Sequence, residues 1–134
     1  IHKLESFIEK RKENFNFLYN NLNKIEQIQL TEKTKNSDPS WFGFPITIKK
    51  DSNINRIDIL KFLETRKIGT RLLFAGNITK QPAYIGLNFK IYGELVKTNV
   101  AMNNSFWIGV FPGITQPMLD YMVESIHDFF IQTK

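Results

Sequence analysis

Cysteine is absent from the 134 residues of this chain. Disulfides, thiolate metal sites and cysteine nucleophiles are therefore excluded within it, and the absence favours a cytoplasmic location. Long apolar runs are missing as well, because stretches such as FWIGVF fall far short of the roughly 20 apolar residues that a membrane-spanning helix needs. We therefore expect a protein without a membrane partner.

Histidine is scarce, since only His2 and His127 occur. Neither stands at a recognisable spacing from a serine or carboxylate partner, so both are interpreted as ordinary surface histidines. No cluster of histidine, aspartate and glutamate has metal-ligand spacing, and no glycine-rich phosphate motif occurs. The residues by themselves therefore predict neither a catalytic residue nor a metal site in this chain.

The net charge of +5 is modest and comes from 18 basic and 13 acidic residues. Such a bias suits a phosphate-bearing ligand as well as nucleic acid. Cations and aromatic residues are neighbours between positions 56 and 74, so a free-standing basic binding module without catalysis stays an alternative. No sequence signature of a DNA- or RNA-binding fold accompanies the charge, and we expect no nucleic-acid partner.

Hydrophobic periodicity predicts three main helices. Residues 1–25 carry an apolar stripe at spacings of three and four, which is typical of a long helix. A second helix is predicted between the capping residues Ser52 and Asn53 and a stop at Gly69. The third is predicted to begin after Thr115, which can cap it.

Strands are predicted at residues 28–30, 41–49 and 106–111, where apolar, aromatic and β-branched residues lie between turn formers. Pro45 has no backbone N–H and therefore predicts an edge position or a bulge. With a short helix expected near residues 100–103, the elements include too few strands for a doubly wound fold. We expect an α+β fold, a small and mainly antiparallel sheet with helices on one face.

The segment TRLLFAGNITKQPAY, which we call the 70–84 segment, is typical of neither a strand nor a helix. Its two cations, glycine, proline, two aromatics and polar side chains suit either a connection or a binding surface. The aromatic residues of the predicted strands are instead interpreted as core side chains, namely Trp41, Phe42, Trp107 and Phe111.

Several stretches together resemble the C-terminal part of the DegT/StrS family of sugar-modifying enzymes that use pyridoxal phosphate. They are GTRLLFAGNITKQPAY, TNVAMNNSFWIGVFPGITQPMLDYMVESI, WFGFPITIK and the helix before Gly69. Residues 106–123 match a family signature made of an apolar strand, a Pro-Gly turn and a helix. The order and spacing of these pieces fit the family over nearly the whole chain.

The 70–84 segment narrows the resemblance to one branch of the family. Sugar aminotransferases of the family carry a GIxTxxHYPxPxHxQPAY-like loop, and this chain places Leu73, Phe74 and Thr79 where a histidine, a tyrosine and a second histidine are expected. The variant TRxLFAGNxTxQP is similar to the 3-dehydrase branch, the CDP-6-deoxy-4-hexulose 3-dehydrases and related GDP-sugar 3-dehydratases. The resemblance implies removal of the C3 hydroxyl of a nucleotide-linked 4-keto-6-deoxyhexose, which serves 3,6-dideoxyhexoses of O-antigen lipopolysaccharide.

The resemblance also implies a domain organisation. Residues 1–134 would be the single C-terminal small domain of a fold-type-I enzyme, with residues 1–25 leading in from a cofactor domain outside this sequence. The start at Ile1, already inside a helical pattern, fits a fragment, which we expect to be inactive alone.

The same resemblance implies cofactors and partners for the whole enzyme. The larger domain would bind pyridoxal or pyridoxamine phosphate and, in the CDP-sugar members, a two-iron two-sulfur cluster. The partners would be a CDP- or GDP-linked 4-keto-6-deoxyhexose and a second subunit in a homodimer. A nucleotide-sugar aminotransferase stays the alternative within the family.

On this resemblance, five residues of the 70–84 segment are candidate substrate contacts. Arg71 offers a planar guanidinium to a phosphate or sugar oxygen, and Phe74 offers an apolar wall. Asn77 and Gln81 would present amide groups to hydroxyls, and Gly76 would let the backbone approach closely. The alternative is that Arg71 pairs with a carboxylate and the amides brace the loop.

Overall fold

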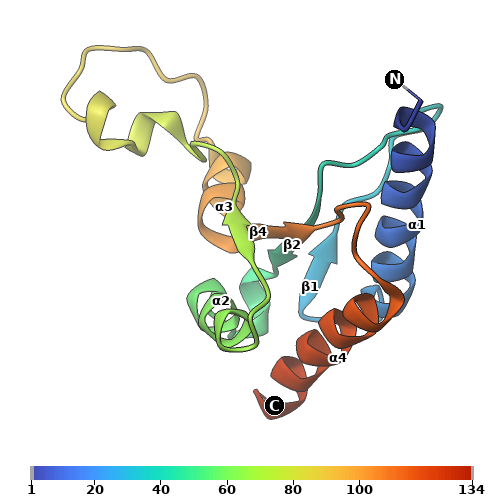
Figure 1. Ribbon diagram of the computed structural model, residues 1–134. Helices are drawn as coiled ribbons and strands as arrows, with labels where there is room; N and C mark the ends of the chain where they lie inside the picture. The colour runs from blue at the N-terminus through green and yellow to red at the C-terminus, as the bar shows by residue number, and fades with distance from the viewer. Residues whose placement is uncertain (1, 134) are drawn as a thin grey trace.

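An antiparallel sheet of four strands organises residues 2–133, the residues that the computed structural model describes (Figure 1). The strand order is β1-β2-β4-β3. The strands are β1 (Ile28–Leu30), β2 (Gly43–Ile48), β3 (Thr70–Leu72) and β4 (Ser105–Gly109), and the α-helices are α1 (Leu4–Leu22), α2 (Arg56–Thr65), α3 (Val96–Asn104) and α4 (Gln116–Gln132). The expected α+β class is confirmed.

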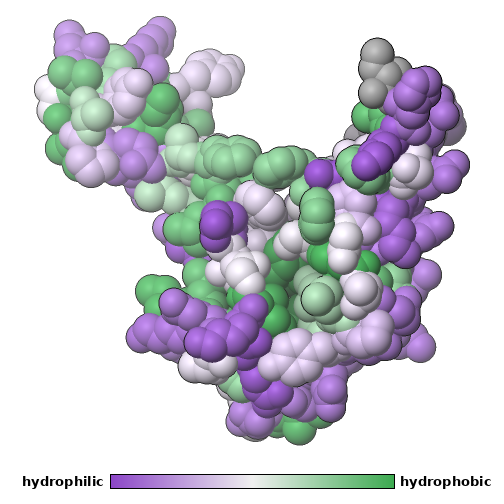
Figure 2. Space-filling model, in the orientation of Figure 1, coloured by the Kyte–Doolittle hydropathy of each residue, from purple (hydrophilic) through white to green (hydrophobic). Residues whose placement is uncertain are grey.

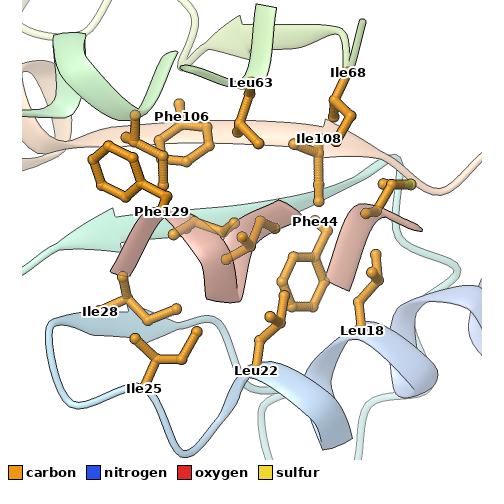
Figure 3. Close-up of a cluster of buried hydrophobic side chains, with 14 of the residues drawn as sticks. Leu18, Leu22, Ile25, Ile28, Phe44, Leu63, Ile68, Phe106, Ile108 and Phe129 are labelled. Carbon is orange, nitrogen blue, oxygen red and sulfur yellow. The ribbon is translucent and has the colours of Figure 1, made fainter. Parts of the chain in front are cut away.

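The core lies on one face of this sheet, which we call the inner face. Alternate residues of β2 and β4, among them Phe44, Ile46, Phe106 and Ile108, point to this face and are fully buried. Figure 3 shows Phe44, Phe106 and Ile108 among side chains of the surrounding helices. Helices α1, α2 and α4 supply this cover, and α4 contacts both of the others.

Helix α1 is packed only over its C-terminal half. Phe15 and Leu18 are buried, whereas Leu4 is 60% exposed. In Figure 1 the N-terminal half of α1 extends past the sheet, so its apolar stripe continues onto open surface. No helix in the described part of the chain is both long and apolar enough to cross a membrane.

Helix α2 begins later than the sequence predicts. Ser52 and Asn53 belong to a 3-10 turn and its end, and Asn53 adopts a left-handed backbone with φ of 55°. The N-cap is Asn55, whose side-chain oxygen accepts a hydrogen bond of 2.9 Å from the Ile57 N–H. The predicted helix is therefore real, but its predicted cap is wrong. Ser52, Asn53 and Asn55 are all of residue types that favour the N-cap, so the sequence alone does not choose among them.

The end of α2 also differs from the prediction. Lys67, with φ of 61°, takes the left-handed position at the end of the helix, two residues before the predicted stop at Gly69. The Ile68 N–H then donates to the Leu63 carbonyl at 2.9 Å, which closes a Schellman-type turn. Because the turn is complete at Ile68, Gly69 leads directly into β3.

Strand β2 is central in the sheet, yet Pro45 has a strand neighbour on one side only. Pro45 is paired with Trp107 of β4, while β1 reaches only as far as Ile46. The expected edge environment of the proline is therefore found locally, inside a strand that is not itself an edge strand.

Candidate substrate-binding site

The outer face of the sheet, opposite the core, carries an aromatic group beside Arg71. Arg71 of β3 is paired with Trp107 of β4, so both side chains leave the same face. The ring centroid of Trp107 lies 5.1 Å from that of Phe42 and 6.5 Å from that of Phe74. Phe42 and Phe74 are 66% and 79% exposed. One cation and three aromatic rings thus share an open surface.

The interpretation of all four strand aromatics as core is only partly right. Trp41 is partly buried and stacks on Phe15 with ring centroids 5.0 Å apart. Phe42 and Phe111, however, are exposed, at 66% and 64%. Phe42 lies just before β2 begins at Gly43, so strand alternation does not fix its direction, and its ring packs against Trp107 instead of entering the core.

Arg71 keeps its guanidinium available on this face. The side chain is exposed, and its Nη1 donates to the carbonyl of Thr70 at 2.8 Å. Among residues 2–133, the ion pairs formed are Lys10–Glu13, Lys12–Asp38 and Arg66–Asp128, and none of these includes Arg71. The alternative role of Arg71 as the partner of a carboxylate therefore has no support in the described residues.

Beyond β3 the chain turns sharply through Ala75 and Gly76, which have φ values of 50° and 58°. A β-carbon at Gly76 would lie 2.6 Å from Cγ of Met102 on α3, closer than such atoms approach. Gly76 is therefore required both by its left-handed backbone and by its close approach to α3. The neighbour of Gly76 in the structure is a helix of the chain itself, and a close approach of this glycine to substrate stays a prediction.

Asn77 and Gln81 are engaged inside the turn. Asn77 is 2% exposed, and its side chain forms hydrogen bonds to Thr79 and Asn99. Nε2 of Gln81 donates to the carbonyl of Ala75. The bracing role that the sequence left as an alternative is thus observed for both amides, and their contact with substrate stays a prediction.

The five candidate residues consequently fall into two groups. Arg71 and Phe74 lie at the outer face, whereas Gly76, Asn77 and Gln81 form the base of a protruding arm, residues 73–95 (Figure 1). Figure 2 shows hydrophobic residues on the arm and where it joins the body. The exposed large apolar residues of the arm are Phe74, Ile78, Tyr84, Ile85, Leu87, Phe89, Ile91 and Tyr92. The base of the arm is therefore ordered by polar contacts and the remainder presents apolar surface.

A hollow of about 870 Å³ lies elsewhere, between α3 and the β1–β2 side of the sheet. Thr47 and Ser105 line it, joined by a hydrogen bond of 2.8 Å between their hydroxyls. Its lining also includes Tyr19, whose pKa is raised by the hydrogen bond that its hydroxyl forms with Glu32. None of the five candidate residues lines this hollow, so its volume alone does not place the substrate there.

Two comparisons of sequence identify relatives of the chain. Residues 1–127 match the model of the DegT/DnrJ/EryC1/StrS aminotransferase family. The chain belongs to this family. It is 48% identical over 131 residues to the lipopolysaccharide biosynthesis protein RfbH of Salmonella typhimurium, a match that covers 97% of this chain and 30% of that protein.

A second relative is the dTDP-4-dehydro-2,6-dideoxy-D-glucose 3-dehydratase of Saccharopolyspora spinosa, 43% identical over 129 residues, with 96% of this chain and 28% of the enzyme covered. Among solved structures, the GDP-4-keto-6-deoxy-D-mannose-3-dehydratase of E. coli with bound hydrated PLP superposes with a TM-score of 0.83 at 23% identity. That match covers 92% of this chain and 32% of the other, and it shows a common fold. The chain thus spans about 30% of the length of the relatives it matches.

The residues of the outer face do not make a pyridoxal phosphate cradle by themselves. They supply one guanidinium and aromatic rings, the amides of Asn77 and Gln81 lie at the base of the arm, and in the described residues no carboxylate is hydrogen-bonded to any of these groups. Such groups suit a polar, anionic substrate better than the pyridine nitrogen of the cofactor, which needs an acidic partner.

Proposed function

We propose that this chain is the small C-terminal domain of a longer nucleotide-sugar 3-dehydratase. The enzyme removes the C3 hydroxyl of a nucleotide-linked 4-keto-6-deoxyhexose on the way to 3,6-dideoxyhexoses of lipopolysaccharide. The observation that carries this proposal is the 43% identity to a sugar 3-dehydratase. The 48% identity to a lipopolysaccharide biosynthesis protein and the absence of the aminotransferase histidines at Leu73 and Thr79 support it.

The longer protein would supply what this chain lacks. Its remainder holds pyridoxal or pyridoxamine phosphate, which acts as the electron sink when bound, and a two-iron two-sulfur cluster in the case of a CDP-sugar enzyme. Helix α1 leads in from that part, which would cover the apolar residues exposed at its N-terminal half, Leu4 and Phe7. The enzyme works in the cytoplasm as a homodimer.

The small domain contributes substrate binding. The substrate is a CDP- or GDP-linked sugar whose pyrophosphate carries two negative charges. The exposed guanidinium of Arg71 binds this anion or a sugar oxygen in a planar, two-pronged geometry. Phe74, beside Trp107, forms an apolar wall that excludes water from the reacting sugar. Gly76, Asn77 and Gln81 shape the turn that carries Phe74 and approach the sugar from the arm.

A nucleotide-sugar aminotransferase is the second candidate function. It is favoured by the family description and by the preserved Gln81–Tyr84 frame of the 70–84 segment. The two functions differ in the fate of the sugar, because a dehydratase removes the C3 oxygen and an aminotransferase introduces nitrogen.

Substitution of Arg71 tests the binding role. In the full-length enzyme, Arg71→Ala is expected to raise KM for the nucleotide sugar or to lower kcat at least tenfold, which corresponds to about 1.4 kcal/mol. Steady-state kinetics with the nucleotide sugar measures both constants. Lys61→Ala removes an exposed cation of α2 and should leave them unchanged. Normal kinetics for Arg71→Ala would remove Arg71 from the site.

A further inference from the structure

The turn at the base of the arm is held from outside by helix α3. Ala75 and Gly76 both have left-handed backbone angles, which cost energy at the alanine and persist only where surrounding contacts impose them. The next residue, Asn77, is 2% exposed although its side chain is polar. Such a buried amide must find hydrogen-bond partners, and its partners show what holds the turn.

The direction of these hydrogen bonds is fixed by the backbone. The Thr79 N–H can only donate, and it donates to Oδ1 of Asn77 at 3.1 Å. The Thr79 hydroxyl donates to the same oxygen at 2.7 Å. Nδ2 of Asn77 is therefore the donor toward α3, where Oδ1 of Asn99 accepts its hydrogen bond at 2.8 Å. Asn99 must present an oxygen to Asn77.

A second contact reinforces the first from the same face of α3. Met102 stands three residues after Asn99, so the two side chains lie on one side of the helix. The Met102 side chain packs where a β-carbon of Gly76 would be, while its carbonyl accepts a hydrogen bond of 2.6 Å from Nη1 of Arg56. Helix α3 is thus held to α2 by this hydrogen bond, and its own contacts with Asn77 and Gly76 hold the base of the arm.

We infer that Asn99 is a positioning residue for substrate binding. It touches no substrate. Through Asn77 it fixes the turn between Phe74 and Gln81, and so places the aromatic wall and the amide that the proposed function assigns to the sugar. The inference rests on that proposed function for its kinetic consequence, whereas the structural contact between Asn99 and Asn77 is independent of it.

The hydrogen bond between the two asparagines needs a donor at Asn77 and an acceptor at Asn99. Variants of the full-length protein can remove either one. Asn99→Asp keeps an acceptor oxygen, so it should preserve the turn. Asn99→Ala removes the acceptor, and Asn77→Asp removes the donor and sets two oxygens against each other. Asn103→Ala changes an exposed asparagine of the same helix and serves as the matched control.

Hydrogen exchange and kinetics read out the two parts separately. We expect exchange of the Thr79 amide to become at least tenfold faster in Asn99→Ala and Asn77→Asp, with KM for the nucleotide sugar about tenfold higher and kcat within about threefold. Asn99→Asp and Asn103→Ala should match the unmodified protein in both.

Unchanged exchange in Asn99→Ala, or loss of protection in Asn99→Asp, would overturn the contact. Faster exchange with an unchanged KM would overturn the positioning role. If the unmodified protein turns over no nucleotide sugar, the proposed function fails and the exchange result still decides the contact.

Discussion

Replacing Phe44 by alanine is expected to lower the free energy of unfolding of this chain by about 3–5 kcal/mol. Phe44 is fully buried on the inner face of β2, and its ring meets that of Phe15 edge to face with centroids 4.9 Å apart. Removing the ring loses its transfer free energy and leaves a cavity between the sheet and α1. Equilibrium unfolding in urea, followed by tryptophan fluorescence, measures the change.

Phe42→Ala is the matched control for Phe44→Ala. It deletes the same ring two residues earlier on the chain, but Phe42 is 66% exposed and lies against Trp107 on the outer face. We expect a loss of about 1 kcal/mol or less, mainly from that one aromatic contact. Similar losses for the two variants would contradict the assignment of inner and outer faces.

Replacing Arg56 by methionine is expected to cost about 2–3 kcal/mol of folding free energy. Nη1 of Arg56 donates to the carbonyls of Met102 and Ser105, at 2.6 and 3.0 Å, where α3 ends and β4 begins. Burial lowers the pKa of this guanidinium, which reflects the cost of removing it from water. Methionine fills much of the same space but leaves both carbonyls without this donor.

Urea unfolding of Arg56→Met should be compared with Lys61→Met, which changes an exposed cation of the same helix. The Lys61 variant should lie within about 0.5 kcal/mol of the unmodified chain. A stability for Arg56→Met that equals that of Lys61→Met would show that Arg56 does not hold the junction between α3 and β4.

Local sequence patterns predicted the elements that contain many buried residues. The strand around Phe106 and the helix with Leu119, Met122 and Ile126 are found as β4 and α4, because alternation and helical spacing mark a buried face directly. Strand β3 was not predicted. Its three residues include an exposed arginine and a half-exposed leucine, and the strand exists because β4 offers its edge for pairing.

The candidate site was predictable in its residues and less so in their arrangement. The family pattern singled out Arg71 and Phe74, and the structure places both beside Trp107 on one face. No local signal connected Asn77 with Asn99, since the two are 22 residues apart and meet only through the packing of α3 against the arm. Trp107 was predicted to be a core side chain, because a strand sequence does not reveal which of its two faces stays open.

The most direct measurement follows the oxygen at C3 of the sugar. Full-length protein loaded with pyridoxamine phosphate is incubated with CDP-, GDP- and dTDP-linked 4-keto-6-deoxyhexoses that carry ¹⁸O at C3, and the nucleotide sugars are analysed by mass spectrometry. We expect one of these substrates to lose the ¹⁸O label without gaining an amino group. Retention of the label together with an amino group on the sugar would show an aminotransferase and contradict the proposed 3-dehydratase.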